Sequence, residues 1–97
     1  MTPCEKFELQ MNLKKIADHY GFTSQADMLT EEAAEFTVAL NKLRRGYIEA
    51  YDCIIEELAD VLVVAEQLKY IISDDKIESI MLEKSRRQIK RINDEKN

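Results

Sequence analysis

The sequence contains few residues that would interrupt a helix. Only one of its 97 residues is proline and only two are glycine, whereas chains built from many short strands need frequent turn residues. Hydrophobic residues make up 45% of the chain and charged residues 34%, a composition too apolar for a disordered segment. The length corresponds to one small domain. We therefore expect residues 1–97 to form a single all-α domain.

Soft metal ligands are also scarce. The two cysteines, Cys4 and Cys53, are far apart and show no spacing typical of a zinc site or of a disulfide-linked secreted domain. The single histidine, His19, belongs to no Glu-x-x-His pair, which argues against a ferritin-like di-iron bundle. We expect two free thiols, as in a cytoplasmic protein, and any metal would be held by oxygen ligands.

Long apolar runs and excess positive charge are both missing. No stretch approaches the roughly 18 apolar residues of a membrane span, and no apolar signal segment follows Met1. The formal net charge of -5 disfavours duplex nucleic acid and anionic membranes as partners, because both are polyanions. The sequence favours a cytoplasmic protein that binds neither nucleic acid nor membrane, although an acidic chain can still bind anions through metal ions.

The few breaking residues divide the chain into four predicted helices. Gly21 and Gly46 separate the first three, and Ser73 is placed to cap the fourth. The helices are predicted over residues 5–20, 24–45, 48–72 and from 73 onward. Apolar residues occupy two sides of the third helix, and burying both sides requires more than one neighbour. We expect a second subunit to cover the side that carries Cys53, Val64 and Ile71.

Two pairs of acidic residues occur where an amphipathic helix usually carries apolar side chains. At about 100° per residue, Glu32 falls close to the centre of the apolar stripe of the second helix, and Glu35 lies beside it. On the third helix, Glu57 and Asp60 interrupt an otherwise apolar stripe. Each pair is spaced i, i+3 and therefore projects from one side of its helix. If these two helices face each other, four carboxylates converge.

Converging carboxylates require a compensating cation. Removing even one carboxylate from water is costly without a partner, and neighbouring like charges add repulsion. The cation is either a lysine or arginine in a structural ion-pair network or a bound metal. Oxygen ligands without histidine or cysteine suit Mg²⁺ or Mn²⁺, and Ca²⁺ is a further candidate. A solvated acidic face is the alternative that needs no ligand at all.

Basic residues near the end of the sequence supply the opposite charge. Lys84, Arg87 and Arg91 follow i, i+3, i+7 spacing and share one helix face, whereas Arg86 points elsewhere. Arginine binds phosphate oxygens through forked hydrogen bonds, and lysine acts as a point charge. This basic row, residues 84, 87 and 91, is a candidate phosphate-binding surface. Ion pairs with neighbouring glutamates are the alternative explanation.

The motif EEAAE at residues 31–35, followed by ELAD at residues 57–60, resembles the EExxE…ExxD signature of the MazG-like all-α nucleoside triphosphate pyrophosphohydrolases. The segments HYGFTSQ before the first motif and ALNKLRRG after it agree with this family. The resemblance implies a four-helix MazG-like bundle assembled as a dimer or a dimer of dimers. It also implies an enzyme of nucleotide-pool sanitation that cleaves a nucleoside triphosphate to the monophosphate and pyrophosphate.

The resemblance further implies roles for individual residues. The ligands of Mg²⁺, or of Mn²⁺ in its place, would be Glu32, Glu35, Glu57 and Asp60. Contacts to the nucleotide and its phosphates would come from Gln25, Lys84, Arg87 and Arg91. Glu31 and Glu56 are the candidate catalytic residues, because either could position the attacking water. The expected partners are a nucleoside triphosphate and further copies of the same chain.

Two other functions remain open from the sequence. A non-catalytic helical adaptor or antitoxin-like module would dimerise through the third helix and use its acidic residues as a solvated or partner-binding face. A nucleotide-binding regulator would keep the pocket and lack turnover. Metal dependence distinguishes the adaptor from the enzyme, and product formation distinguishes the regulator. No residue indicates which base or sugar is preferred.

Overall fold

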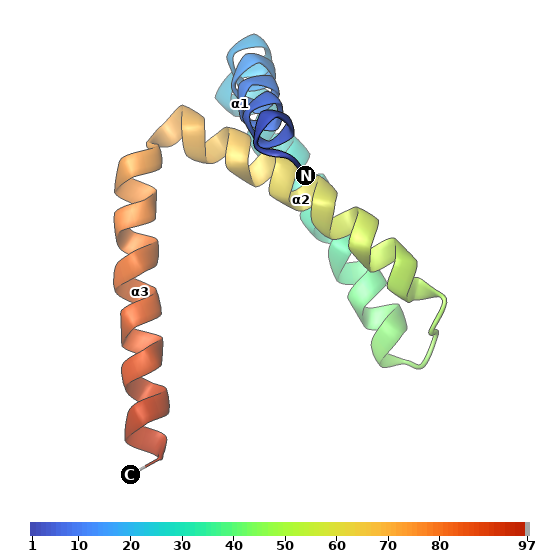
Figure 1. Ribbon diagram of the computed structural model, residues 1–97. Coiled ribbons are helices and arrows are strands. Elements are labelled where there is room, and N and C mark those ends of the chain that lie inside the picture. The colour runs from blue at the N-terminus through green and yellow to red at the C-terminus, as the bar shows by residue number, and fades with distance from the viewer. Residues whose placement is uncertain (97) are drawn as a thin grey trace.

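The computed structural model describes residues 1–96, which form three helices and no strand (Figure 1). Helix α1 spans Pro3–Arg44, α2 spans Ala50–Ile72 and α3 spans Asp74–Glu95. The predicted all-α class is confirmed. Helix α1 contains both of the first two predicted helices, which are joined at a kink instead of being separated by a loop.

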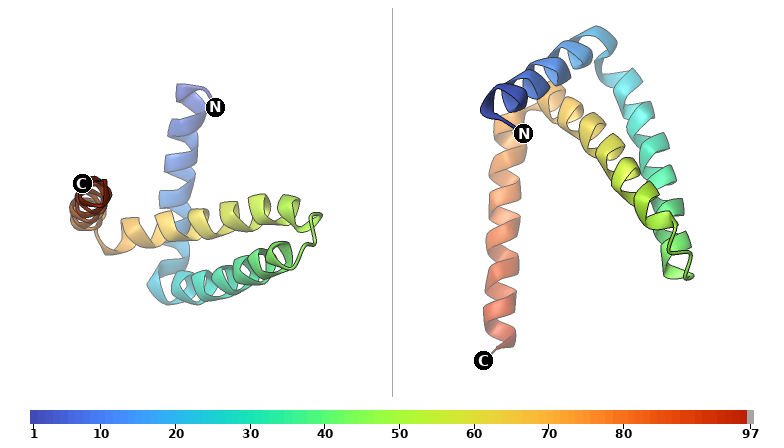
Figure 2. Two further views of the ribbon diagram at one scale, coloured as in Figure 1. Left: turned by 90° about the horizontal axis from the view of Figure 1, so that it is seen from below. Right: turned by 45° about the vertical axis from the view of Figure 1, so that its right-hand side comes forward.

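Gly21 produces the kink in α1. Its backbone adopts φ 82° and ψ 179°, which lies outside the helical region and is accessible almost only to glycine. The two arms of α1 therefore run in different directions (Figure 2). The arm after Gly21 runs beside α2. The arm before Gly21 crosses α2 nearer the end that leads to α3 (Figure 1, Figure 2).

Local side-chain hydrogen bonds fix the starts of two helices. The Thr2 hydroxyl accepts a hydrogen bond from the Glu5 amide at 3.1 Å, and the Glu5 carboxylate accepts one from the Thr2 amide at 2.9 Å. This reciprocal pair is a capping box, and Pro3 suits the first helical position because it has no amide hydrogen to satisfy. The Ser73 hydroxyl accepts from the Lys76 amide at 3.3 Å, so the predicted cap of the last helix is confirmed.

The core is small and lies between α1 and α2. Its buried apolar residues are Ala17, Ala39, Ala50, Val64 and Leu68. Within one chain Val64 is buried, Ile71 is half-buried and Cys53 is exposed, so α1 already covers part of the side assigned to a second subunit, and the subunit interface itself stays a prediction. On the side of α2 expected to form the core, Ile55 is 58% and Leu62 52% exposed, whereas Ile54, Val61 and Ala65 are half-buried. Helix α1 therefore packs between the two predicted apolar stripes of α2.

Helix α3 projects away from the pair formed by α1 and α2 (Figure 1) and has no buried residue. Its backbone approaches α2 but not α1. Lys69 fixes the junction, because its Nζ lies 2.8 Å from Glu78 Oε1 and 3.4 Å from Asp74 Oδ1 across Ser73. The hydrogen bond to Glu78 is the largest effect on Lys69 and raises the pKa of its ammonium group. The predicted four-helix bundle is not seen within one chain, and assembly as a dimer or a dimer of dimers stays a prediction.

Large apolar side chains remain exposed on every helix. Phe7 on α1, Ile55 on α2 and Ile89 on α3 are each more than half exposed. Extensive apolar surface of this kind is typical of an interaction surface in a soluble protein. Within residues 1–96, none of the helices has the length and apolar character that crossing a bilayer requires.

Replacing Gly21 with alanine is expected to lower the free energy of unfolding by about 1–3 kcal/mol, because alanine is strained at a positive φ. A Cβ at this position would meet no heavy atom within 4 Å, so the substitution tests backbone conformation alone. Urea denaturation followed by circular dichroism measures the change. Asp27→Ala, at an exposed position of the same helix, is the control. Equal stability of Gly21→Ala and wild type would contradict the kinked geometry.

Candidate metal centre

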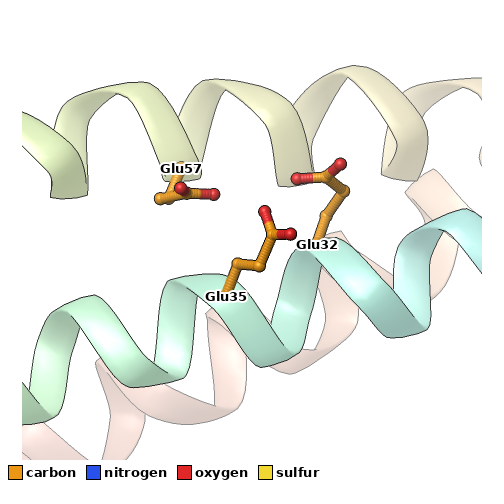
Figure 3. Close-up of side chains that lie close together, drawn as sticks. All are labelled: Glu32, Glu35 and Glu57. Carbon is orange, nitrogen blue, oxygen red and sulfur yellow. The ribbon is translucent and has the colours of Figure 1, made fainter.

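The carboxylates of Glu32, Glu35 and Glu57 converge between α1 and α2 (Figure 3). One oxygen from each carboxylate lies within 4.8 Å of the corresponding oxygens of the other two. Glu32 and Glu35 project from α1, and Glu57 projects from α2 toward them (Figure 3). The structure thus brings together three of the four carboxylates named from the sequence, and these three residues are called the carboxylate cluster below.

A short connection sets the register that places these side chains opposite one another. Residues 45–49 join α1 to α2, and the chain reverses there with Gly46 at φ 95°. The Gly46 amide donates to the Leu43 carbonyl at 3.0 Å, and the Tyr47 amide donates to the Lys42 carbonyl at 3.1 Å. The two helices consequently run antiparallel from a fixed turn, which brings the EEAAE and ELAD motifs to the same level.

Two oxygens of the carboxylate cluster are buried without a partner. Glu32 Oε2 and Glu57 Oε2 are inaccessible to solvent and accept no hydrogen bond from any described residue. Across residues 1–96, no lysine or arginine forms an ion pair with Glu32, Glu35 or Glu57. The alternative of a structural ion-pair network therefore has no cation within one chain. Buried carboxylate oxygens in this state are unfavourable until a proton or a cation reaches them.

The environment of the cluster acts against ionisation. Burial is the largest cause that raises the pKa of Glu32, and the negative charges of Glu35 and Asp60 act in the same direction. Burial is again the largest cause for Glu57, whose pKa is also raised by the neighbouring Glu35 carboxylate. The same causes mean that a nearby positive charge, either a proton or a metal ion, would stabilise both groups.

The other acidic candidates lie at the edge of the cluster or outside it. Asp60 is exposed and near enough for its charge to raise the pKa of both Glu32 and Glu57, but it is not one of the three converging residues. Glu31 is exposed beside the cluster, and its charge raises the pKa of Glu32. Glu56 is also exposed and contributes to neither pKa shift.

The resemblance assigned Gln25 to nucleotide contacts, but the structure places its side chain in the core. It is buried, and its amide Nε2 donates a hydrogen bond to Oε1 of Gln67, which is also buried. The pair links α1 to α2 and satisfies polar groups that would be costly to bury alone. Sequence reasoning missed Gln67, because a glutamine within an apolar helix face gives no signal until its partner is known.

The basic row lies in the second half of α3, and it does not contact the carboxylate cluster of its own chain. Lys84, Arg87 and Arg91 line one shallow depression on α3, so the predicted shared face is present. Arg87 pairs with Glu83 at 3.6 Å, and both side chains are exposed, an arrangement that contributes little to stability. Since the backbone of α3 does not approach that of α1, the basic row and the cluster are separated within one chain.

A cavity of about 620 Å³ adjoins the carboxylate cluster, with Glu35 and Glu57 in its wall. It extends toward the turn that joins α1 to α2, where Lys42, Arg45 and Tyr47 also line it. None of these three residues was among the predicted site residues. Two cations and a tyrosine around Gly46 were the available signal, but only the fold shows that they face the same cavity as the carboxylates.

Comparison with known protein families, with curated proteins and with solved structures finds no match. The chemistry of the donor set is therefore the basis for a functional assignment. Three carboxylates without histidine or thiolate suit a hard ion such as Mg²⁺ or Mn²⁺ better than zinc. The two buried oxygens without partners fit the same kind of ion, because each has a lone pair to offer.

In the absence of divalent metal, Glu57→Gln is expected to raise the melting temperature near neutral pH. The pKa of Glu57 is raised in the folded state, so the folded protein binds more protons than the unfolded chain, and stability falls as the pH rises through this interval. Glutamine has no charge to bury and removes that loss. The gain should be larger at about pH 8 than near pH 4.5, the ordinary pKa of glutamate.

Thermal melting in EDTA at both pH values measures this effect. Glu56→Gln is the matched control, because Glu56 is the adjacent residue and is exposed. Its melting temperature should follow that of the wild type at both pH values. A lower melting temperature for Glu57→Gln at about pH 8 would show that the carboxylate makes a stabilising contact, which contradicts the unpartnered geometry.

Proposed function

We propose that the protein is a Mg²⁺-dependent nucleoside triphosphate pyrophosphohydrolase that releases the monophosphate and pyrophosphate. The observation that carries this proposal is the pair of buried oxygens, on Glu32 and Glu57, that face a third carboxylate without any cation from the chain. The order and spacing of EEAAE and ELAD support the same conclusion through their resemblance to the MazG-like signature. Mn²⁺ fits the same oxygen ligands.

The charges of the cluster and of the substrate make the proposal coherent. A triphosphate carries about four negative charges, and bare carboxylates would repel it. A bound divalent ion supplies charge neutralisation for the phosphates and lowers the pKa of water. In this proposal Glu32, Glu35 and Glu57 hold the ion, and Asp60 completes the ligand set from the edge of the cluster.

The remaining catalytic task is to orient water. Glu31 is exposed directly beside the cluster, where its carboxylate can accept a proton from a water molecule aligned with the leaving pyrophosphate. The oxygen of that water forms a new bond to phosphorus while the bond to the pyrophosphate oxygen breaks. Glu56 is the other candidate from the sequence, and no contribution to the cluster supports it over Glu31.

Self-assembly belongs to the same proposal. Helix α3 carries exposed apolar side chains and the basic row, and its backbone approaches only α2. In one chain α3 does not cover the exposed Ile55 and Leu62 of α2 or meet the carboxylate cluster. The α3 of a second copy could contact both. In a dimer or a dimer of dimers, Lys84, Arg87 and Arg91 would bind the phosphates at the cluster of the partner.

A non-catalytic dimerisation module is the second candidate. The exposed apolar residues of α2 and α3 favour it, because they call for a partner whether or not the protein has an active site. This function gives no reason for placing two carboxylate oxygens in a buried position without a hydrogen bond. Hydrolysis therefore accounts for more of the structure.

Hydrolysis should be detected when the purified chain is incubated with Mg²⁺ and a panel of ribo- and deoxyribonucleoside triphosphates. Chromatography should show the monophosphate and pyrophosphate, and EDTA should abolish both. Glu57→Gln should reduce kcat at least about a hundredfold, because it removes a metal ligand, a larger loss than that of an outer-shell contact.

The matched control for this experiment is Glu8→Gln, at an exposed position on the other arm of α1, which should retain activity. Activity that persists in EDTA would contradict the proposal, as would full activity of Glu57→Gln. The absence of product with every triphosphate would favour the adaptor or the regulator.

Arg87→Ala is expected to weaken transition-state binding of the triphosphate by about 1–3 kcal/mol in kcat/KM, the scale of a lost charge-assisted hydrogen bond. Arg86→Ala removes the same charge one residue away, about 100° around the helix, and should change little. Steady-state kinetics of both variants measure the difference. Equal losses would show that the row acts only through general electrostatics.

Mixed assemblies test whether the basic row acts between copies. Glu57→Gln and Arg87→Ala chains are each defective, but an assembly of both contains one cluster and one row that are intact. Co-refolding the two chains should therefore restore part of the activity. If no activity returns although mixed dimers form, the two residues belong to the site of one chain.

A further inference from the structure

We propose that the cavity between Glu57 and the turn at residues 45–49 binds the nucleoside part of a nucleotide whose phosphates lie at the carboxylate cluster. This inference rests on the proposed function, because it takes the cluster as the place of the phosphates. The cavity has a volume of about 620 Å³, within the range of small-molecule sites. Its wall combines an acidic end, two cations and an aromatic ring.

The cavity follows the groove between the two helices from the cluster to the turn. On α1, Glu35 and Lys42 are seven residues apart and share a face, so they are separated by roughly 10 Å along the helix axis at 1.5 Å per residue. The facing side of α2 completes the cavity wall with Ala50, Cys53 and Glu57. Helical side chains lean toward the N-terminus of their helix, so Lys42 leans back toward the cluster.

Two cations in this wall are available to an anion. Lys42 and Arg45 line the cavity, and neither forms an ion pair with another residue in the range 1–96. Lys42 lies between the cluster and the turn, and Arg45 is the first residue of the turn, so both can approach the phosphate next to the sugar. Glu49 lines the cavity at the turn and offers an acceptor for a sugar hydroxyl or a base amino group.

Tyr47 supplies a surface for the base. Its backbone is held by the hydrogen bond from its amide to the Lys42 carbonyl at 3.1 Å, and its side chain lines the cavity while remaining 55% exposed. An accessible aromatic ring in a fixed turn is suited to stacking on a nucleobase. A simple phosphate chain would leave this ring and the apolar wall formed by Val38 and Ala50 without a role.

Calorimetric titration in the presence of Mg²⁺ tests the proposal. The probes are the α,β-imido analogues of dATP, dCTP, dGTP and dUTP, which resist cleavage between the α- and β-phosphates, with inorganic tripolyphosphate as the probe that lacks a nucleoside. For at least one analogue, Tyr47→Ala should raise Kd about fivefold or more, the lower end of the effect of losing one stacked base. Tyr47→Phe keeps the ring and should restore affinity. Tripolyphosphate should bind Tyr47→Ala and wild type equally.

Neighbouring residues provide matched controls. Tyr51 is 57% exposed but lies outside the cavity wall, so Tyr51→Ala should leave Kd within twofold. Arg45→Ala should weaken binding of every analogue, whereas Arg44→Ala removes the same charge from an exposed residue outside the wall and should not. Circular dichroism of each variant establishes that it is folded.

Unchanged Kd values for Tyr47→Ala and Arg45→Ala would overturn the proposal, and so would equal losses in the two control variants. Failure of the proposed function gives a different pattern. If analogues bind with the predicted dependence on Tyr47 but no triphosphate is hydrolysed, the nucleoside site stands and the enzymatic role fails. If triphosphates are hydrolysed but their KM is independent of Tyr47, the enzymatic role stands and the nucleoside site fails.

Discussion

The packing of α1 against α2 brings together carboxylates that form no ion pair with any lysine or arginine in residues 1–96. Glu32 and Glu57 each have one carboxylate oxygen that is buried from water and accepts no hydrogen bond from residues 1–96. Glu35 adds a third carboxylate beside them. Such an arrangement opposes folding, since buried like charges are unfavourable. Acidic residues with raised pKa values are common at functional sites, which makes the carboxylate cluster the candidate functional site of this fold.

Gly21 and the turn at residues 45–49 make this interface possible. The kink lets the arm of α1 after Gly21 run along α2 while the other arm crosses it, where Tyr70 donates a hydrogen bond to Asp18 at 3.0 Å. The turn then fixes the antiparallel register. The positions of the carboxylates therefore depend on two glycines with positive φ, Gly21 and Gly46, and neither contributes a functional group.

Helix α3, unlike α1 and α2, has almost no packing partner within one chain. Its ion pairs with Lys69 set the direction in which it leaves α2, but beyond its first turns it has no neighbour in one chain. The helix is amphipathic, so its apolar side can be buried only against a surface outside this chain. The basic row is thus separated from the carboxylate cluster within one chain, and the proposed assembly is what would bring the two together.

Much of the fold was predictable because it depends on local properties of the sequence. Helical periodicity, the scarcity of glycine and proline, and Ser73 as a cap are read within one or two helical turns. The same holds for the i, i+3 spacing of the acidic pairs, which predicted that each pair shares a helix face. The sequence could not say which part of α2 meets α1, so Val64, assigned to a second subunit, is buried within one chain instead.

The sequence by itself determined the helices, the faces that carry Glu32 and Glu35 or Glu57 and Asp60, and the charge of each face. Only the tertiary structure decided that Glu32, Glu35 and Glu57 converge while Asp60 stays at the edge. It also decided that Gln25 pairs with Gln67 in the core and that Lys42 and Tyr47 share a cavity with the cluster. The physical reason is that periodicity fixes direction around one helix axis, whereas the rotation and register between two helices depend on the kink and the turn.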